Sequence, residues 1–234
     1  MFARHLHKLF RLLLLPLWCI SIQSFADNAE YQALFTQQAD EKALQQLAQQ
    51  LNQGPQAIGE FSQSRQLAVL NKALISHGKF TFDSQHGLAW EQLKPFYSAL
   101  VLSGQQITQI DALGQQQTMQ AQGSAAAIAN LMPQLLQAML SGNVSQLQQQ
   151  FKIGFIQNGD HWQLGLIADT PELAKLLPNI VIKGEQQVRQ LLLLSDNGDR
   201  STIDFTQLDY RQLSPSELDI FNGVDADANE INQP

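Results

Sequence analysis

The sequence predicts a mainly β fold of the α+β class, in which short antiparallel strands follow one another along the chain. Apolar and polar residues alternate in short runs from about residue 56 to Asp111, and again from Phe151 to Tyr210. Glycine and proline residues separate these runs, as expected for a meander. Two segments of helical periodicity, residues 28–52 and 124–140, interrupt the strands.

The N-terminus has the features of a secretory signal peptide. Arg4, Lys8 and Arg11 form a basic region, an apolar stretch runs from Leu12 to Ile22, and Ser24-Phe25-Ala26 offers small residues for cleavage. The apolar stretch is too short to span a bilayer core of about 30 Å. We therefore expect Sec-type export to the periplasm and cleavage after Ala26.

Removal of residues 1–26 changes the charge and the chemistry of the chain. Cys19, the only cysteine, is lost, and Trp18 before it is not the small residue that precedes a lipoprotein cysteine. Of 14 basic and 21 acidic residues, the mature chain keeps 11 and 21, a net charge of −10. An acidic mature protein is a poor candidate for binding nucleic acid or anionic membrane by bulk charge. Residues 27–224 suit one domain, and the acidic segment 225–234 predicts a disordered tail.

In the first half, residues 28–52 predict a helix because leucines recur at helical spacing until Gly54-Pro55 ends it. The strands that follow are broken at Gly78, Gly87, Pro95 and Gly104. Their alternating apolar residues include Phe80, Phe82, Leu88, Trp90, Leu100 and Leu102.

Residues 124–140 form the one long apolar helical face of the chain. Pro133 cannot donate an interior helical hydrogen bond, so this is either a kinked helix or two short ones. Its apolar residues are Ile128, Leu131, Met132, Leu135, Leu136, Met139 and Leu140.

The second half returns to strands. Asn158-Gly159 lies between two alternating runs and predicts a hairpin. Residues 171–177 predict one or two helical turns, and a last hairpin is expected with arms Ile180–Leu194 and Ser201–Tyr210. The glutamine runs at 115–117 and 148–150 are interpreted as solvated faces between ordered elements.

The sequence contains no common catalytic, nucleotide-binding or thiol-redox motif. His77, His86 and His161 each lack a second histidine or a cysteine at metal-ligand spacing. We therefore expect neither catalytic residues, nor a metal site, nor a cofactor, and the lack of these motifs favours binding over catalysis.

Several motifs are similar, in their order and spacing, to those of LolA-type outer-membrane lipoprotein carriers. The central ones are the run from Ser76-His77-Gly78-Lys79-Phe80 to Trp90, then Lys94-Pro95, then residues 100–104 (LVLSG). Phe61-Ser62-Gln63 upstream, the segment 156–164 and Ile203-Asp204-Phe205 downstream also match, so the resemblance covers about residues 43–221.

The resemblance implies a half-closed antiparallel β-barrel that is covered by short lid helices and encloses an apolar cavity for acyl chains. It also implies a monomeric carrier that takes a lipoprotein or lipid cargo from an inner-membrane donor transporter to an outer-membrane acceptor. The cavity and lid candidates are the six strand residues and the helix residues named above: Phe80, Phe82, Leu88, Trp90, Leu100, Leu102, Ile128, Leu131, Met132, Leu135, Leu136 and Met139. A large apolar residue is also the ordinary content of a core, so each of them has that alternative.

One position departs from the family pattern. Where the family carries an Arg-Pro pair whose arginine holds the lid, this chain has Asp83-Ser84-Gln85-His86, with Ser84 at the arginine position. A serine cannot offer a guanidinium fork across a cavity. The departure leaves the cargo open between a lipoprotein and another envelope lipid.

Two other functions remain as alternatives. One is an envelope sensor on the same fold that binds a membrane protein. The other, ranked below it, is an esterase that acts on the bound lipid.

Overall fold

The computed structural model describes residues 30–221 except 52, 105, 121–134, 137, 141, 175, 176 and 178. The first six strands are β1 (Gln56–Gln66), β2 (Leu74–Asp83), β3 (Gly87–Lys94), β4 (Ser98–Ser103), β5 (Gln106–Ile110) and β6 (Gln116–Gln120). The last five are β7 (Phe151–Asn158), β8 (His161–Ala168), β9 (Asn179–Gly184), β10 (Val188–Leu194) and β11 (Arg200–Asp209). The helices are α2 (Gln32–Thr36), α3 (Glu41–Leu51), α5 (Val144–Leu147) and α6 (Pro171–Ala174), and residues 215–221 form a further helix.

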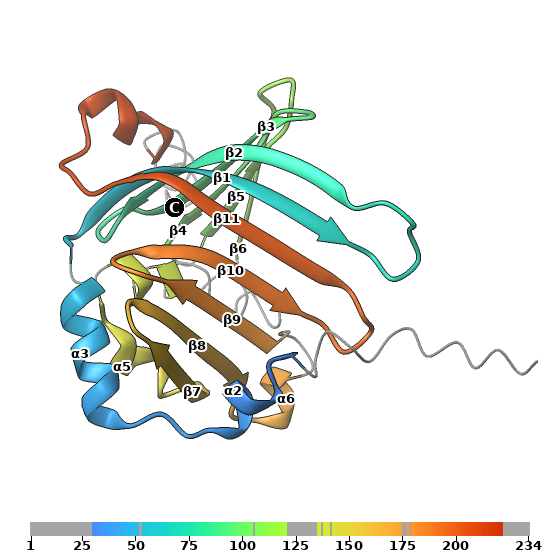
Figure 1. Cartoon of the computed structure of the whole chain (residues 1–234). Helices are drawn as coiled ribbons and strands as arrows, with labels where there is room; N and C mark the ends of the chain where they lie inside the picture. Colours follow the sequence, from blue (N-terminus) through green and yellow to red (C-terminus); the bar gives the residue numbers. More distant parts are fainter. Residues whose placement is uncertain are drawn as a thin grey trace, which may run out of the picture.

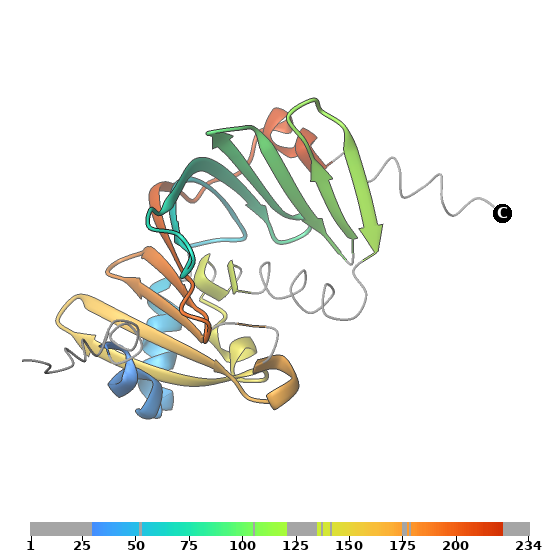
Figure 2. The ribbon, with the colours of Figure 1, turned by 90° about the vertical axis from the view of Figure 1, so that its right-hand side faces the viewer.

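All eleven strands form one antiparallel sheet in the order β6-β5-β4-β3-β2-β1-β11-β10-β9-β8-β7 (Figure 1). The first strand pairs with the last, Phe61 opposite Phe205, so the two halves of the chain join in the middle of the sheet. Figure 2 shows the sheet curving into two walls, one of β1–β6 and one of β7–β11. The edge strands β6 and β7 are not neighbours, which makes the sheet the half-closed antiparallel barrel that the resemblance implies.

The main core lies on the concave side of the sheet. Alternation along the strands places the apolar residues of β7–β11 on this face, against α3 and residues 135–147. Burial of this surface is the main term that stabilises the fold. The sheet contributes chiefly Phe151, Ile153, Phe155, Trp162, Leu164, Leu166, Ile180, Ile182, Leu191, Ile203 and Phe205, and the cover contributes Leu44, Leu47, Leu51, Leu135, Leu136, Ala138, Met139, Leu140, Val144 and Leu147.

The predicted helix 28–52 is wrong in its continuity, since α2 and α3 are separate. Between them Gln38 forms an isolated β-bridge with Gly154, and the Ala39 amide donates to the Ile153 carbonyl at 3.0 Å. A Cβ atom on Gly154 would lie 1.8 Å from the Leu34 carbonyl oxygen, so only glycine lets α2 approach the sheet this closely. The chain therefore crosses the edge strand β7 and protects it from pairing with another molecule.

Three further expectations are corrected by the sheet register. Gly78 does not break a strand but lies inside β2, where a Cβ would be 2.0 Å from the Glu91 carbonyl oxygen. The arm Ile180–Leu194 is two strands, β9 and β10, separated by a turn at 185–187. Gln116 and Gln117 belong to β6 rather than to a connection between ordered elements.

The predicted signal peptide and acidic tail lie outside the described residues. Within the described part of the chain, no helix is long and apolar enough to cross a membrane.

Candidate ligand-binding face

Four aromatic rings gather on the concave face where β1, β2, β3 and β11 meet. Trp90 stacks on Phe61 with ring centroids 3.7 Å apart, and Phe80 lies parallel to it at 6.3 Å. Phe205 meets Trp90 edge-on at 6.4 Å. Such arrangements stabilise beyond the area that they bury.

Two glycines make room for these rings. A Cβ atom on Gly78 would lie 2.6 Å from Phe61, and one on Gly59 would lie 2.7 Å from Phe80. The rings therefore lie flat along the backbone of the neighbouring strands, and the concave wall is smooth and apolar at this point.

The predicted strand residues all share this face. The register pairs Phe80 with Trp90 and Trp90 with Leu100 on one line across the sheet, and a second line runs from Phe82 through Leu88 to Leu102. Of the six, Phe80, Phe82, Leu88 and Leu102 are buried in the core. Trp90 is only partly buried and Leu100 is 37% exposed.

Of the predicted helix residues, Leu135, Leu136 and Met139 are buried against the concave face. Met139 borders a narrow apolar space of about 10 Å³ in front of Trp162 and Leu164, which is about the least volume that holds one water molecule and far less than an acyl chain needs. Ile128, Leu131 and Met132 lie outside the described residues.

The two walls of the concave face differ in their cover. The β7–β11 wall is closed over by α3 and residues 135–147, and Trp162 is only 1% exposed. The β3–β5 part of the other wall keeps partly accessible apolar side chains at Trp90, Leu100 and Ile107. The accessible apolar surface of the concave face, among the described residues, therefore lies on β3–β5.

Phe61, Phe205 and Ile107 were not among the predicted site residues. All three alternate with polar neighbours in their strands, so the pattern that selected Phe80 and Trp90 could have selected them too. Phe61 and Phe205 pair between the first strand and the last, and the sequence alone does not give that register.

A second cavity, of about 430 Å³, lies beside the edge strand β7. Its walls include Gln37, Gln38 and Gln148 as well as Phe35 and Phe151, and none of the predicted residues lines it. The mixed lining does not match an acyl chain, which needs a continuous apolar surface.

The turn that carries Ser84 is held by Asp83. The Asp83 carboxylate accepts hydrogen bonds from the backbone amides of Gln85 at 2.7 Å and His86 at 2.9 Å, and the His86 ring lies 3.0 Å away. The Gln56 amide donates to its other oxygen. Ser84 itself is exposed, so its side chain does not reach into the concave face.

These contacts set the charge of Asp83. Burial acts to raise its pKa, but the hydrogen bonds from Gln56, from the two backbone amides and from the His86 ring outweigh it. The pKa of Asp83 therefore lies below its ordinary value of 3.8, and the side chain is a carboxylate at neutral pH.

Few side chains among the described residues near this face could act as an acid, a base or a metal ligand. The Tyr210 hydroxyl is buried without a hydrogen-bond partner among the described residues, and burial raises its pKa to about 12. It therefore stays a neutral phenol at neutral pH. The described residues hold no group of three histidine, cysteine or acidic side chains that could bind a metal ion.

Comparisons with solved structures find distant likenesses. A LolA superfamily protein from Nitrosomonas europaea is 8% identical, with 77% of this chain and 97% of that chain covered and a TM-score of 0.41. MucB in the MucA/MucB complex of Pseudomonas aeruginosa is 14% identical, with 76% and 59% covered and a TM-score of 0.42. A domain of an outer membrane lipoprotein-sorting protein from Vibrio parahaemolyticus is 8% identical, with 78% and 96% covered and a TM-score of 0.38. A search of the curated proteins finds no match.

The family comparison is more direct. Residues 53–220, which include all eleven strands, match the family described as outer membrane lipoprotein carrier protein LolA. The chain belongs to the LolA family.

Proposed function

We propose that the chain is a periplasmic carrier that binds the acyl chains of a lipoprotein or another envelope lipid on its concave face and moves them towards the outer membrane without making or breaking a bond. The observation that carries the proposal is the partly accessible apolar surface of Trp90, Leu100 and Ile107 inside a half-closed barrel. The family match and the features of residues 1–26 support the cargo class and the compartment.

The proposed mechanism is sequestration by burial. An acyl chain that lies along β3–β5 would exchange its contact with water for contact with Trp90 and Leu100. Each buried methylene would contribute about 0.8 kcal/mol to the binding free energy. Binding of this kind is strong for a long acyl chain and still reversible, because no single contact holds the ligand.

The cover at residues 135–147 is the part of the protein that would move to admit more of the acyl chain. Its contact with the β7–β11 wall is apolar, and unbranched Met139 can repack around a ligand. Since Ser84 is exposed at the far side of a turn, we propose that this cover closes by apolar packing rather than through an arginine.

Tryptophan fluorescence tests the site directly. The mature chain would contain two tryptophans, partly buried Trp90 on the first wall and buried Trp162 on the second. In Trp162→Phe, a brominated acyl chain should quench the remaining Trp90 emission in a saturable way. In Trp90→Phe, the emission of Trp162 should change little.

Each result has a clear reading. Quenching of Trp162 alone would place the ligand behind the cover and contradict the proposed landing surface. Absence of quenching in both variants would reject the carrier function and favour a protein-binding sensor. Intact mass of the periplasmic protein checks the export part, since the expected first residue is Asp27.

A further inference from the structure

Large apolar side chains are exposed at one end of the strands of the sheet. The β1–β2, β3–β4 and β5–β6 turns all lie at this end, as the antiparallel register requires. Eight of the nine exposed large apolar residues in the described part of the chain lie here, and the ninth is Leu100 on the concave face. We call these eight the apolar rim: Val69, Leu70, Leu74, Ile75, Leu93, Phe96, Tyr97 and Leu113.

The rim residues project at the tips of the sheet. Val69 is 88% exposed, Phe96 75% and Leu113 83%, each from a different hairpin. Residues 74–76 of β2 extend beyond the last residue of β3, so the β1–β2 hairpin stands out from the sheet (Figure 1). At the other end of the strands, no large apolar residue of the described chain is exposed at a turn.

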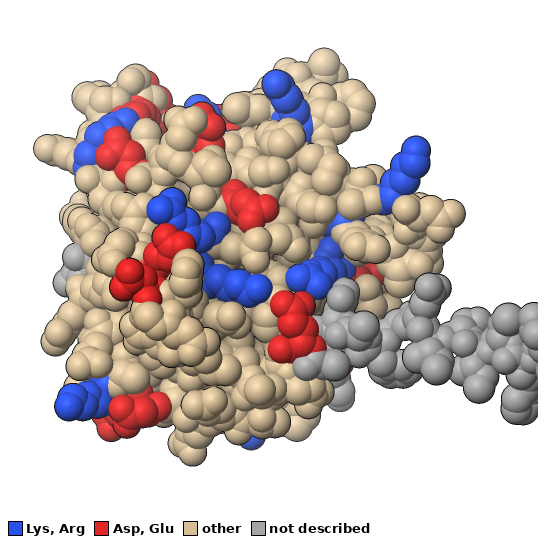
Figure 3. All heavy atoms as spheres, in the orientation of Figure 1, with Lys and Arg blue, Asp and Glu red and all other residues tan. Residues whose placement is uncertain are grey.

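The two segments that carry seven of the eight rim residues are basic, whereas the whole protein is acidic. Residues 61–82 and 92–110 contain no Asp or Glu, although the chain has 21 acidic residues. The cations of these segments near the rim are Arg65, Lys72 and Lys94, all exposed. Figure 3 shows a basic side chain projecting at the end of the β1–β2 hairpin, with mostly uncharged surface around it.

Two of the acids that border the rim accept hydrogen bonds from backbone amides. Asp111 accepts them from Leu113 at 2.8 Å and from Gln115 at 2.9 Å within its own turn. Asp199, in the neighbouring β10–β11 turn, accepts one from the Ala68 amide at 2.9 Å and so ties that turn to the β1–β2 connection.

We propose that the apolar rim is a docking surface for an anionic phospholipid membrane. Apolar side chains on three separate tips can enter the interface of a flat bilayer together, while cations between them meet the lipid head groups. A protein partner would instead be expected at a continuous patch with a pocket. This inference concerns a surface outside the concave face and does not depend on acyl binding there.

Vesicle flotation tests the proposal. The purified mature protein should float with vesicles of phosphatidylethanolamine and phosphatidylglycerol, and much less with vesicles of phosphatidylcholine alone. Phe96→Ser and Val69→Ser should each weaken binding by about tenfold. Because both side chains are exposed, the thermal unfolding midpoint should not change.

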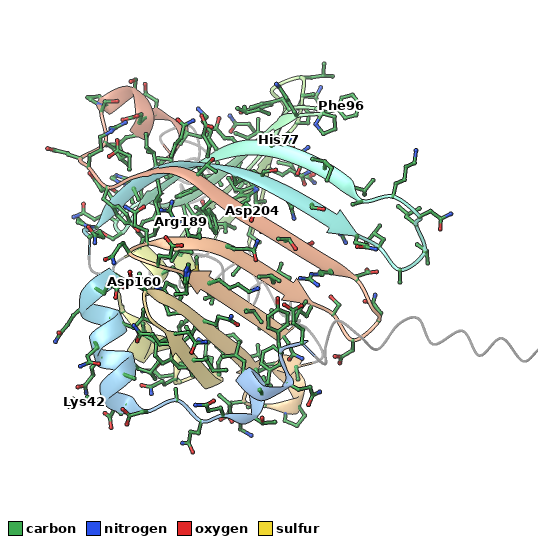
Figure 4. The ribbon with its side chains drawn as sticks, in the orientation of Figure 1. Lys42, His77, Phe96, Asp160, Arg189 and Asp204 are labelled. Atoms are coloured by element: carbon green, nitrogen blue, oxygen red, sulfur yellow. The ribbon has the colours of Figure 1, made fainter. Side chains whose placement is uncertain are left out.

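A charge-matched pair isolates the local effect. Lys72→Glu on the rim and Lys42→Glu on α3 change the net charge equally, and Lys42 lies on the other side of the molecule from Phe96 (Figure 4). Lys72→Glu should weaken flotation by about tenfold or more, and Lys42→Glu should leave it almost unchanged.

Two results would overturn the proposal. One is a wild-type protein that does not float with phosphatidylglycerol vesicles, which would leave the rim as a surface for a protein partner. The other is an equal loss in Lys72→Glu and Lys42→Glu, which would show that only bulk charge matters. Quenching of Trp90 by a soluble brominated acyl chain should persist in all rim variants, so failure here and failure of the carrier function are distinguishable.

Discussion

The side chain of Asp83 holds the turn that follows β2. Its carboxylate accepts hydrogen bonds from the backbone amides of Gln85 and His86 and from the side chain of Gln56 on β1. The turn therefore needs the charged form of Asp83 rather than any group at Ser84. The Ser84 side chain is exposed, so the hydrogen bonds of Asp83 do not depend on it.

We predict that Asp83→Asn destabilises the protein by about 1–2 kcal/mol at pH 7, since hydrogen bonds to a charged acceptor are stronger than those to a neutral one. The pKa of Asp83 is lowered in the folded state, so its contribution is present above the unfolded value of 3.8 and is lost as the pH falls through the folded value. Urea unfolding at pH 7 and below pH 3.8 measures this.

A control removes the same charge elsewhere. Asp160→Asn, in the exposed β7–β8 turn, should change the stability little at either pH. An Asp83→Asn variant as stable as the wild type at pH 7 would contradict the role given to this carboxylate.

Two variants distinguish whether residues 135–147 are a movable cover or a fixed part of the core. Leu136 on the cover and Leu166 on β8 are both almost fully buried, at 1% and 0% exposure. We predict that Leu166→Asp unfolds the protein, because an unpaired charge inside the sheet costs several kcal/mol. If residues 135–147 are the movable cover proposed above, Leu136→Asp should keep most of the thermal stability and should lower the affinity for a fluorescent acyl probe by tenfold or more.

The two variants are compared by thermal unfolding and probe titration. If Leu136→Asp is unfolded at room temperature, residues 135–147 are core and not cover. If it is folded and binds the probe as tightly as the wild type, the segment has no part in binding.

Element types were predictable from the sequence where a local rule decided them. Asn158-Gly159 gave the β7–β8 hairpin, and alternation placed Phe80 and Trp90 on one face. The break between α2 and α3 was not predictable, because it comes from the pairing of Gln38 with Gly154 more than a hundred residues away. Nor was the aromatic cluster, since only the register of β1 with β11 brings Phe61 and Phe205 together. The sequence thus predicted the alternation along the described strands and not which residues meet across the sheet.

The accessible apolar surface of the molecule is divided between two regions, the concave face and the apolar rim, which differ in exposure. The concave face keeps its accessible part between two walls, on β3–β5, while the rim lies at the tips of the same hairpins. The β3–β4 hairpin carries both Leu100 and Phe96, so a ligand on the concave face and a membrane at the rim would meet on one element. A lipid that leaves the membrane could therefore reach β3–β5 over a short path along this hairpin.

Because the barrel is open on one side, the space between its walls limits how much of an acyl chain the molecule can bury. In a series of ligands that share one head group and differ by two methylenes, each added methylene should lower the Kd about fourfold while it is still buried, from about 0.8 kcal/mol per methylene. The gain should stop at the length that fills the space between the walls. At a free ligand concentration of 100 Kd, binding should stabilise the folded chain by about 2.7 kcal/mol, which for a chain of this size raises Tm by roughly 5–10 °C. Probe displacement gives the Kd series and thermal unfolding gives the shift. A Kd that does not change with chain length would mean that the head group alone is recognised, and the concave face would then not be the binding site.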